Sequence, residues 1–190
     1  MVRNRWQQLL LICVLTSMAM PRSLLSQAST DAERNRQLIT RHFELMNRGR
    51  WREAAEMFSP EVRHHLGTWG ESGGERIVQG KELLTQNLDD IFQTFPDWKM
   101  EIVDMVADSA EVVVRCRVSG THKGIGTRRI NGGFLMGVKP TGKHFEVQHM
   151  HWYKIRDGKI IDHFASRDDL GMTQQLGLLP RPASPSPQGK

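Results

Sequence analysis

The sequence contains little cysteine, and this scarcity limits the kinds of site that the protein can hold. Of its two cysteines, Cys13 lies within an N-terminal apolar run and Cys116 lies within a second apolar run far along the chain. If the N-terminal segment is removed on export, Cys116 remains alone. A lone cysteine excludes an internal disulfide and a cysteine-rich metal site. We therefore expect Cys116 to be a buried, inert thiol of the core.

The N-terminal apolar run is too short to span a membrane. It extends over Leu9–Met20, about 12 residues, whereas a transmembrane helix needs about 20. Arg3 and Arg5 precede the run, and small residues follow it at Ser26–Ala28. This layout is typical of a secretory signal peptide rather than of a membrane anchor. We predict that residues 1–28 form a cleaved signal peptide and that the mature protein is exported, to the periplasm or the medium, without a stable membrane span.

The mature sequence has almost no excess of charge of either sign. Loss of Arg3, Arg5 and Arg22 with the signal reduces the basic residues from 26 to 23, against 21 acidic residues, and the net charge from +5 to +2. The basic residues are spread along the chain, apart from a short stretch at Lys123–Arg129. Nucleic-acid-binding proteins gather positive charge on one face. We therefore expect no nucleic-acid partner.

The periodicity of the apolar residues divides the mature chain into helices followed by strands. In the first part of the chain, apolar residues spaced three and four apart predict helices. On either side of an Asp157-Gly158 turn, apolar and polar residues alternate, which predicts a β-hairpin. This order favours an α+β fold with the helices packed on one face of an antiparallel sheet. We expect one domain at 29–178 and a disordered Pro/Ser-rich tail at 179–190. The expected helices are 31–48, 51–58, 80–95 and 168–176, and the expected strands are 61–66, 98–106, 111–119, 143–155 and 160–166.

Six short motifs follow one another across this domain. They are Phe95-Pro96-Asp97, Gly120-Thr121-His122-x-Gly124, Pro140-Thr141-Gly142-Lys143, Arg156-Asp157-Gly158-Lys159-Ile160-Ile161-Asp162-His163-Phe164, Asp168-x-x-Gly171 and Gln175-Leu176-Gly177. None is decisive alone, but six in this order are far more specific. In this respect the chain resembles the SnoaL-like polyketide cyclases, or ester cyclases, a branch of the NTF2-like superfamily, over residues 33–178.

The resemblance implies both a fold and a chemistry. The fold is a cone, in which a curved antiparallel sheet wraps around N-terminal helices and encloses one pocket, with a homodimer or higher oligomer packed through the sheet. The chemistry is ring closure by intramolecular aldol addition, without metal or cofactor, with an aspartate as the acid/base group. The His-x-x-x-x-Asp spacing assigns these catalytic positions to His163 and Asp168, and Asp169 is adjacent. The expected ligand is a small apolar or aromatic compound.

The sequence also departs from the family pattern near the expected pocket. The segment between Gly124 and Pro140 is longer than usual, Phe164 replaces a tryptophan, and the strand before the hairpin carries His149, His151 and Trp152 where small or aliphatic residues are usual. We therefore expect a substrate different from those of the known cyclases.

Asp168 has two interpretations that the sequence does not separate. As a base it would remove a proton next to a carbonyl group, and an apolar pocket would raise its pKa toward neutrality. As the N-cap of the final helix it would instead accept hydrogen bonds from free backbone N–H groups. One carboxylate does not easily do both, so the direction in which it points decides between them.

The histidines have several possible roles. His149 and His151 share one face of strand 143–155 with Tyr153, and Met150 shares the opposite face with Trp152, so either set could line the pocket. A histidine could donate to an oxyanion, be a hydrogen-bonded structural residue, or join Asp168 in a zinc or iron site, although the family uses no metal. His64 and His144 are expected on the surface. The candidate pocket residues are His65, His122, His149, His151 and Trp152.

Two functions from different classes fit these observations. The first is a cofactor-free acid/base enzyme, such as a cyclase, isomerase, lyase or hydrolase, acting on a small apolar carbonyl compound. The second is a binding module that holds such a ligand without changing it. Because the superfamily contains both, the fold alone does not separate them. A third possibility, an oligomeric interaction module, predicts a cavity filled by the protein's own side chains.

Overall fold

The computed structural model describes residues 22–68, 75–128 and 135–180 of the 190-residue chain. Residues 1–21 of the expected signal, residues 129–134 of the long connection and residues 181–190 of the expected tail lie outside this part. The first described helix passes through Ala28, the expected cleavage point. In the described part of the chain, no helix is both long enough and apolar enough to cross a bilayer.

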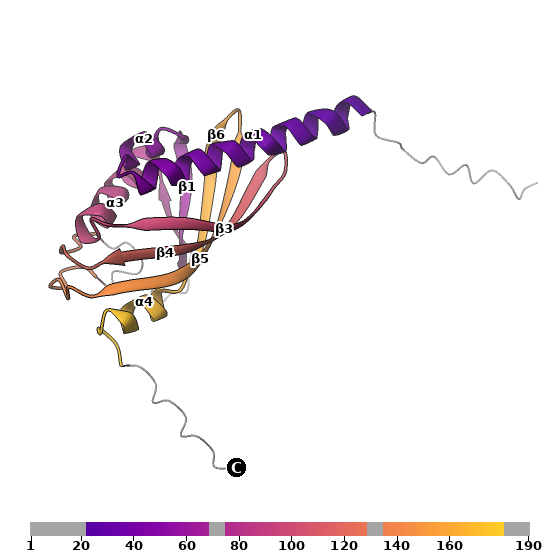
Figure 1. Cartoon of the computed structure of the whole chain (residues 1–190). Coiled ribbons are helices and arrows are strands. Elements are labelled where there is room, and N and C mark those ends of the chain that lie inside the picture. The colour runs from indigo at the N-terminus through magenta and orange to yellow at the C-terminus, as the bar shows by residue number, and fades with distance from the viewer. Residues whose placement is uncertain (1–21, 69–74, 129–134, 181–190) are drawn as a thin grey trace, which may run out of the picture.

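Within the described residues, four helices and six strands form an α+β fold around one curved sheet (Figure 1). The sheet order is β2-β1-β6-β5-β4-β3. Helices α1 and α3 cover one face, and α4 packs against β5. The helices are α1 (Arg22–Asn47), α2 (Trp51–Ala55), α3 (Lys81–Thr94) and α4 (Asp169–Gln175). The strands are β1 (Phe58–Thr68), β2 (Glu75–Gln79), β3 (Lys99–Ala107), β4 (Glu111–Thr121), β5 (His144–Arg156) and β6 (Lys159–Arg167).

The expected α+β cone is confirmed, with two differences in the sheet. Strand β2 was not expected, because it follows a Gly-rich segment and has only five residues. It pairs with β1, whereas β1 pairs with β6 in parallel, so the sheet is not antiparallel throughout. Parallel pairing joins strands far apart in the sequence, and no local pattern reports it. The irregularity expected near Asp104 is present as a register shift between Ile102 and Asp104.

The core lies between the helices and the covered face of the sheet. Along α1, Ile39, Phe43 and Met46 are buried at the spacing of one helical face. They belong to the same buried cluster as Val114 and Cys116 of β4, both of which are fully buried. Burial raises the pKa of the Cys116 thiol to about 12, so that the thiol stays protonated and unreactive, as expected for a core cysteine.

Strand β5 has an uninterrupted alternation of exposed and buried residues over most of its length. Its pairing with β4 is continuous from Glu111 opposite Lys154 to Thr121 opposite His144, without a bulge. A strand in regular register keeps every second side chain on one face. The buried set therefore includes His149 and His151, and the exposed set includes Trp152.

Gly124 is held so closely against the end of α3 that no larger residue fits. Its N–H donates to the carbonyl of Thr94, and a Cβ atom at this position would overlap the carbonyl oxygen of Gln93. We expect Gly124→Ala to lower the free energy of unfolding by about 3 kcal/mol, because backbone must move to relieve the overlap. Urea denaturation measures this.

Gly142→Ala is the matched control. A Cβ atom there meets no neighbour, although Gly142 has a φ of 69°, so only the left-handed conformation, about 1 kcal/mol, opposes the substitution. Equal losses in the two variants would show that the contact with α3 does not explain why glycine occupies position 124.

Candidate functional site

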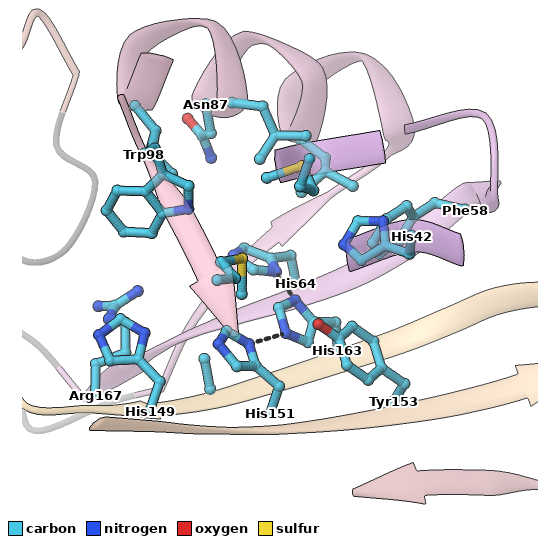
Figure 2. A pocket seen from close by; sticks show the side chains of 16 residues that line it. His42, Phe58, His64, Asn87, Trp98, His149, His151, Tyr153, His163 and Arg167 are labelled. Carbon is cyan, nitrogen blue, oxygen red and sulfur yellow. Dashed lines mark hydrogen bonds between the residues drawn. The ribbon is translucent and has the colours of Figure 1, made fainter. Parts of the chain in front are cut away.

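A cavity lies between the covered face of the sheet and helices α1 and α3 (Figure 2). Counted out to its mouth, with the open solvent there included, its empty space is about 660 Å³. Apolar side chains make up about half of the lining, and histidines make up most of the remainder. The lining residues are His42, Met46, Phe58, His64, Leu84, Asn87, Leu88, Ile91, Trp98, Met100, His149, His151, Tyr153, His163, Ala165 and Arg167.

Four elements bring the histidines together. Strand β5 contributes His149 and His151 from its buried face. His163 projects from the neighbouring strand β6, where it lies opposite Tyr153 of β5. His64 comes from β1, in parallel register with His163, and His42 comes from the buried face of α1. Because these strands are adjacent in the order β1-β6-β5, their inward side chains form a row across the cavity floor.

Three of these histidines form a hydrogen-bonded chain. His151 Nδ1 lies 2.8 Å from His163 Nε2, and His163 Nδ1 lies 2.7 Å from His64 Nδ1. The ring of Tyr153 stacks on that of His163, with centroids 4.5 Å apart and an interplanar angle of 3°. The two bonds run through both nitrogens of the central ring (Figure 2). His163 thus connects two histidines that both line the cavity.

The cavity histidines are neutral at physiological pH. Burial lowers the pKa of His42 to about 4 and the pKa values of His64 and His149 to about 3. Burial likewise lowers the pKa values of His151 and His163 well below their usual value, and neighbouring histidines and Arg167 add to this effect. Desolvation disfavours the charged form of a base, which explains the common direction.

Neutrality restricts where the protons of the chain can be. Each neutral imidazole has one N–H, and each hydrogen bond needs one donor and one acceptor. The His151–His163–His64 chain therefore has two consistent arrangements. In the first, His151 Nδ1 donates to His163 Nε2 and His163 Nδ1 donates to His64 Nδ1, so His151 Nε2 has a free lone pair. In the second, His64 Nδ1 donates to His163 Nδ1 and His163 Nε2 donates to His151 Nδ1, so His151 Nε2 carries the proton.

Five residues of the cavity each have a buried polar atom without a partner within the described part of the chain. Every such atom lacks both a hydrogen-bonding side chain and a backbone group within reach. Buried polar atoms are usually satisfied, so a group of them around one cavity indicates a polar ligand or bound water. The atoms are His42 Nδ1, Trp98 Nε1, His149 Nδ1, His151 Nε2 and Arg167 Nε.

The sequence matches a family model, SnoaL-like polyketide cyclase, over residues 36–176. The match covers most of the chain and includes every residue named in the cavity. The chain belongs to the SnoaL-like polyketide cyclase family. Among curated proteins, none matches this SnoaL-like chain.

Solved structures agree with the family assignment in their fold. IdmH of Streptomyces antibioticus, a candidate polyketide cyclase, is 28% identical, and the match covers 74% of this chain and 96% of IdmH with a TM-score of 0.57. A candidate SnoaL-like polyketide cyclase of Jannaschia sp. CCS1 is 20% identical over 78% and 95% of the two chains, with a TM-score of 0.64. AclR of Streptomyces galilaeus, a candidate hydroxylase, is 24% identical over 78% and 98%, with a TM-score of 0.61.

Asp168, the expected base of a SnoaL-like cyclase, does not line the cavity. It is the N-cap of α4, and its Oδ1 accepts a hydrogen bond from the N–H of Gly171 at 2.7 Å. It is exposed and is not among the residues that line the cavity. The structure therefore corrects the expectation that Asp168 faces the ligand and supports the N-cap interpretation. Among the described lining residues there is no Asp or Glu.

The N-cap role of Asp168 predicts a stability effect. We expect Asp168→Ala to lower the free energy of unfolding by about 1 kcal/mol, because the first turn of α4 loses its acceptor, and Asp168→Asn to be close to wild type. Chemical denaturation of the two variants measures the difference. An Asp168→Ala protein as stable as wild type would contradict the capping role.

Three expected pocket residues lie elsewhere. His65 is buried on the opposite face of β1, where its Nε2 lies 2.6 Å from Asp162 Oδ1 and its ring stacks on Phe164. Trp152 is on the outer face of β5, 38% exposed. His122 is fully buried beyond the cavity, near Thr141. His149 and His151 line the cavity, as expected of pocket residues, and His144 is exposed as expected. His163 also lines the cavity, and its expected catalytic role stays a prediction.

Several residues that line the cavity were not expected there from the sequence. His64 was expected on the surface, but its strand places it on the inward side and its neighbour His65 on the outward side. His42 stood within the apolar stripe of its helix, and a polar residue in such a stripe is a signal of a polar site in the core. Arg167 follows His163 and Ala165 at two-residue spacing and shares their face.

Arg167 lies between the cavity and an acidic neighbour. Its Nη2 donates to Asp169 Oδ2 at 3.2 Å, and the two side chains are only 10% and 14% exposed. Burial raises the pKa of the Asp169 carboxyl above its usual range, although the charge of Arg167 opposes that shift. Asp169, the neighbour of the expected base, therefore contacts a residue of the cavity lining without lining the cavity itself.

The histidines do not converge on one point as metal ligands would. Three of them are engaged in hydrogen bonds with one another, and Asp168 is engaged with its own helix. In the described ranges, no group of three or more His, Cys, Asp or Glu side chains is placed to hold a metal ion. The zinc or iron site considered from the sequence has no support in this arrangement.

Proposed function

We propose that this SnoaL-like protein catalyses cofactor-free proton transfer, as in a cyclisation or isomerisation, on a small and largely apolar carbonyl compound. The observation that carries the proposal is the hydrogen-bonded chain His151–His163–His64, whose first member has an unpartnered Nε2 in the cavity. In this proposal His151, rather than Asp168, is the acid/base group. His163 is the positioning residue that links it to His64.

The proposed reaction begins with His151 in the arrangement that leaves its Nε2 lone pair free. Nε2 takes a proton from the carbon next to the substrate carbonyl, and His151 passes its Nδ1 proton to His163 Nε2. His163 in turn passes its Nδ1 proton to His64 Nδ1. Because His64 also lines the cavity, its own Nε2 proton can return to a different atom of the same substrate. A proton thus moves between two positions of one molecule, which is what an isomerisation or an aldol ring closure requires.

The lowered pKa values of the histidines are compatible with this role. They ensure that the bases are unprotonated and available at physiological pH. When the substrate loses its proton, negative charge develops on the carbonyl oxygen, and a nearby anion favours protonated imidazole. The proton affinity of the chain therefore rises as the transition state forms, and the apolar walls strengthen this attraction by excluding water.

Family relationships support the same class of reaction. The chain belongs to the SnoaL-like polyketide cyclases, and IdmH, a candidate polyketide cyclase, is 28% identical. The inferred substrate class rests on the cavity lining, which is apolar around the histidines. Compounds of this kind, such as aromatic ketones with an acidic α-hydrogen, are suitable test substrates.

The experiment is α-proton exchange in deuterated water, followed by proton NMR over a panel of aromatic and alicyclic ketones. We expect the mature protein to accelerate exchange for compounds that fit the cavity and that stabilise it thermally. Exchange separates proton abstraction from the final reaction, so the true product need not be known. Ketones that bind and stabilise the protein without any faster exchange would overturn the proposal.

That outcome would favour the second candidate function, a ligand-binding module. One observation supports it specifically, namely that the described lining contains no carboxylate and that the expected catalytic aspartate is an N-cap. Export of the protein and self-association through the outer face of the sheet are not needed for either function. Both remain predictions.

A further inference from the structure

One end of the cavity carries three nitrogen atoms that are buried and without a partner. They are Trp98 Nε1, His149 Nδ1 and Arg167 Nε. Trp98 is 7% exposed, His149 is 4% exposed, and the Arg167 side chain is 10% exposed. Unsatisfied polar groups at this depth cost stability unless something occupies the space that they face.

These three side chains lie together although they come from different elements. Arg167 of β6 is opposite His149 of β5 in the strand register, and the ring centroids of His149 and Trp98 are 6.4 Å apart. His151 is next in the row, with its ring centroid 5.6 Å from that of His149. Figure 2 shows Trp98, His149 and Arg167 at one end of the cavity, with His42 and Tyr153 at the other.

The chemistry of these nitrogens restricts what they can bind. Indole Nε1 and guanidinium Nε only donate hydrogen bonds, and a neutral imidazole can donate through Nδ1. The shared partner must therefore be an acceptor, and oxygen is the common one. Arg167 also has a positive charge. Asp169 contacts only the Nη2 atom of its guanidinium group, so the Nε atom remains for the ligand.

We propose that Trp98, His149 and Arg167 form a subsite for a negatively charged oxygen, and that the substrate is an acidic carbonyl compound. A 1,3-dicarbonyl compound or a phenolic ketone has this character, because its conjugate base carries the charge on oxygen. With the oxygen held at this end, the adjoining carbon faces His151. The assignment of the reacting carbon rests on the proposed function, whereas the binding of the anion does not.

Anion selectivity is tested with two probes that share a nitrophenyl ring, 4-nitrophenolate and its neutral methyl ether, 4-nitroanisole. Calorimetry, at a pH above the pKa of the free phenol, gives the two affinities. We expect the phenolate to bind at least about ten-fold more tightly, since hydrogen bonds to a charged group are worth roughly that much. The phenolate absorption band reports its ionisation in the bound state.

The double variant Arg167→Met/Asp169→Asn removes the charge without leaving Asp169 unpaired. We expect the ratio of the two affinities to fall to about one in this protein, whereas Asp169→Asn alone keeps or increases it. Arg41→Gln removes a positive charge from an exposed ion pair on α1 and should leave the ratio unchanged. Circular dichroism and the melting temperature verify folding.

If the double variant is unfolded, Trp98→Phe replaces it and should lower the ratio of the two affinities by about three-fold or more, through the loss of one neutral donor.

The subsite is overturned if 4-nitrophenolate does not bind, if the ether binds equally well, or if the selectivity survives in the Arg167 and Trp98 variants. These outcomes are independent of the exchange assay. Anion selectivity without α-proton exchange would retain the subsite and reject the proposed reaction. α-Proton exchange without anion selectivity would retain the proposed reaction and reject the subsite.

Discussion

Acidification from about pH 7.5 to pH 5.5 is expected to remove about 4 kcal/mol of folding stability through three histidines alone. In the folded protein the pKa is about 4 for His42 and about 3 for His64 and His149. In the unfolded chain each is about 6.5. Between these values the unfolded state binds more protons, so stability falls as the pH falls. At pH 5.5 each histidine contributes about 1.4 kcal/mol to this loss.

The loss is large compared with the total stability of a domain of this size, which is usually about 5–15 kcal/mol. His151 and His163 add to it in the same direction. The loss down to pH 5.5 precedes the titration of most carboxylates, because Asp and Glu have pKa values near 4. The histidine contribution continues to grow below pH 5.5, until the pH reaches the folded-state pKa values of these histidines. Melting temperatures measured by calorimetry across this pH interval test the prediction.

His42→Gln should weaken the pH dependence, because it removes one group that takes up a proton on unfolding. His144→Gln is the matched control, since His144 is on the surface, and it should leave the slope unchanged. A melting temperature that stays constant from neutral pH to pH 5.5 would show that the cavity histidines are solvated well enough to titrate in the folded state.

His151→Gln is expected to slow α-proton exchange by about 10²–10⁴-fold, which is the usual contribution of a positioned acid/base group. Gln keeps a polar side chain that can contact His163 but cannot take up a proton. Asp168→Asn is the informative comparison, because it retains the cap and should keep the rate within about three-fold of wild type. Proton NMR in deuterated water measures the three rates on one substrate.

Binding of the neutral probe 4-nitroanisole provides the control for His151→Gln. Its affinity should change little, because the apolar walls are intact, so a lost rate reports chemistry rather than a collapsed cavity. The opposite pattern, with exchange retained in His151→Gln and lost in Asp168→Asn, would return the catalytic role to the aspartate of the family pattern.

The sequence was sufficient for the fold but not for the direction of individual side chains. The six motifs and the change from helical to strand periodicity identified the α+β cone. They left open which face of β5 is inward, because His149 and Trp152 alternate within the same strand. The pairing of β5 with the valine-rich strand β4, under helix α1, decides this, and such packing has no local signature in the sequence.

Asp168 and His64 illustrate the same limit at single positions. The spacing from His163 fits a catalytic aspartate and an N-cap equally well, and only the hydrogen bond to Gly171 separates them. For the adjacent pair His64 and His65, a shift of the strand register by one residue exchanges the side chain that points inward and the one that points outward. The parallel register of β1 with β6, which no nearby residue specifies, places His64 in the cavity.

The chain of three histidines has a consequence for kinetics, because both of its ends face one cavity. In the proposed reaction, each transfer through the chain reverses both hydrogen bonds, so the protein that releases product differs from the protein that bound substrate. The two free forms are tautomers, one suited to the forward reaction and one to the reverse. At high substrate concentration, turnover by the proposed reaction cannot be faster than the return from one tautomer to the other. Where that return is slow, product inhibits non-competitively, by trapping the form that substrate does not use.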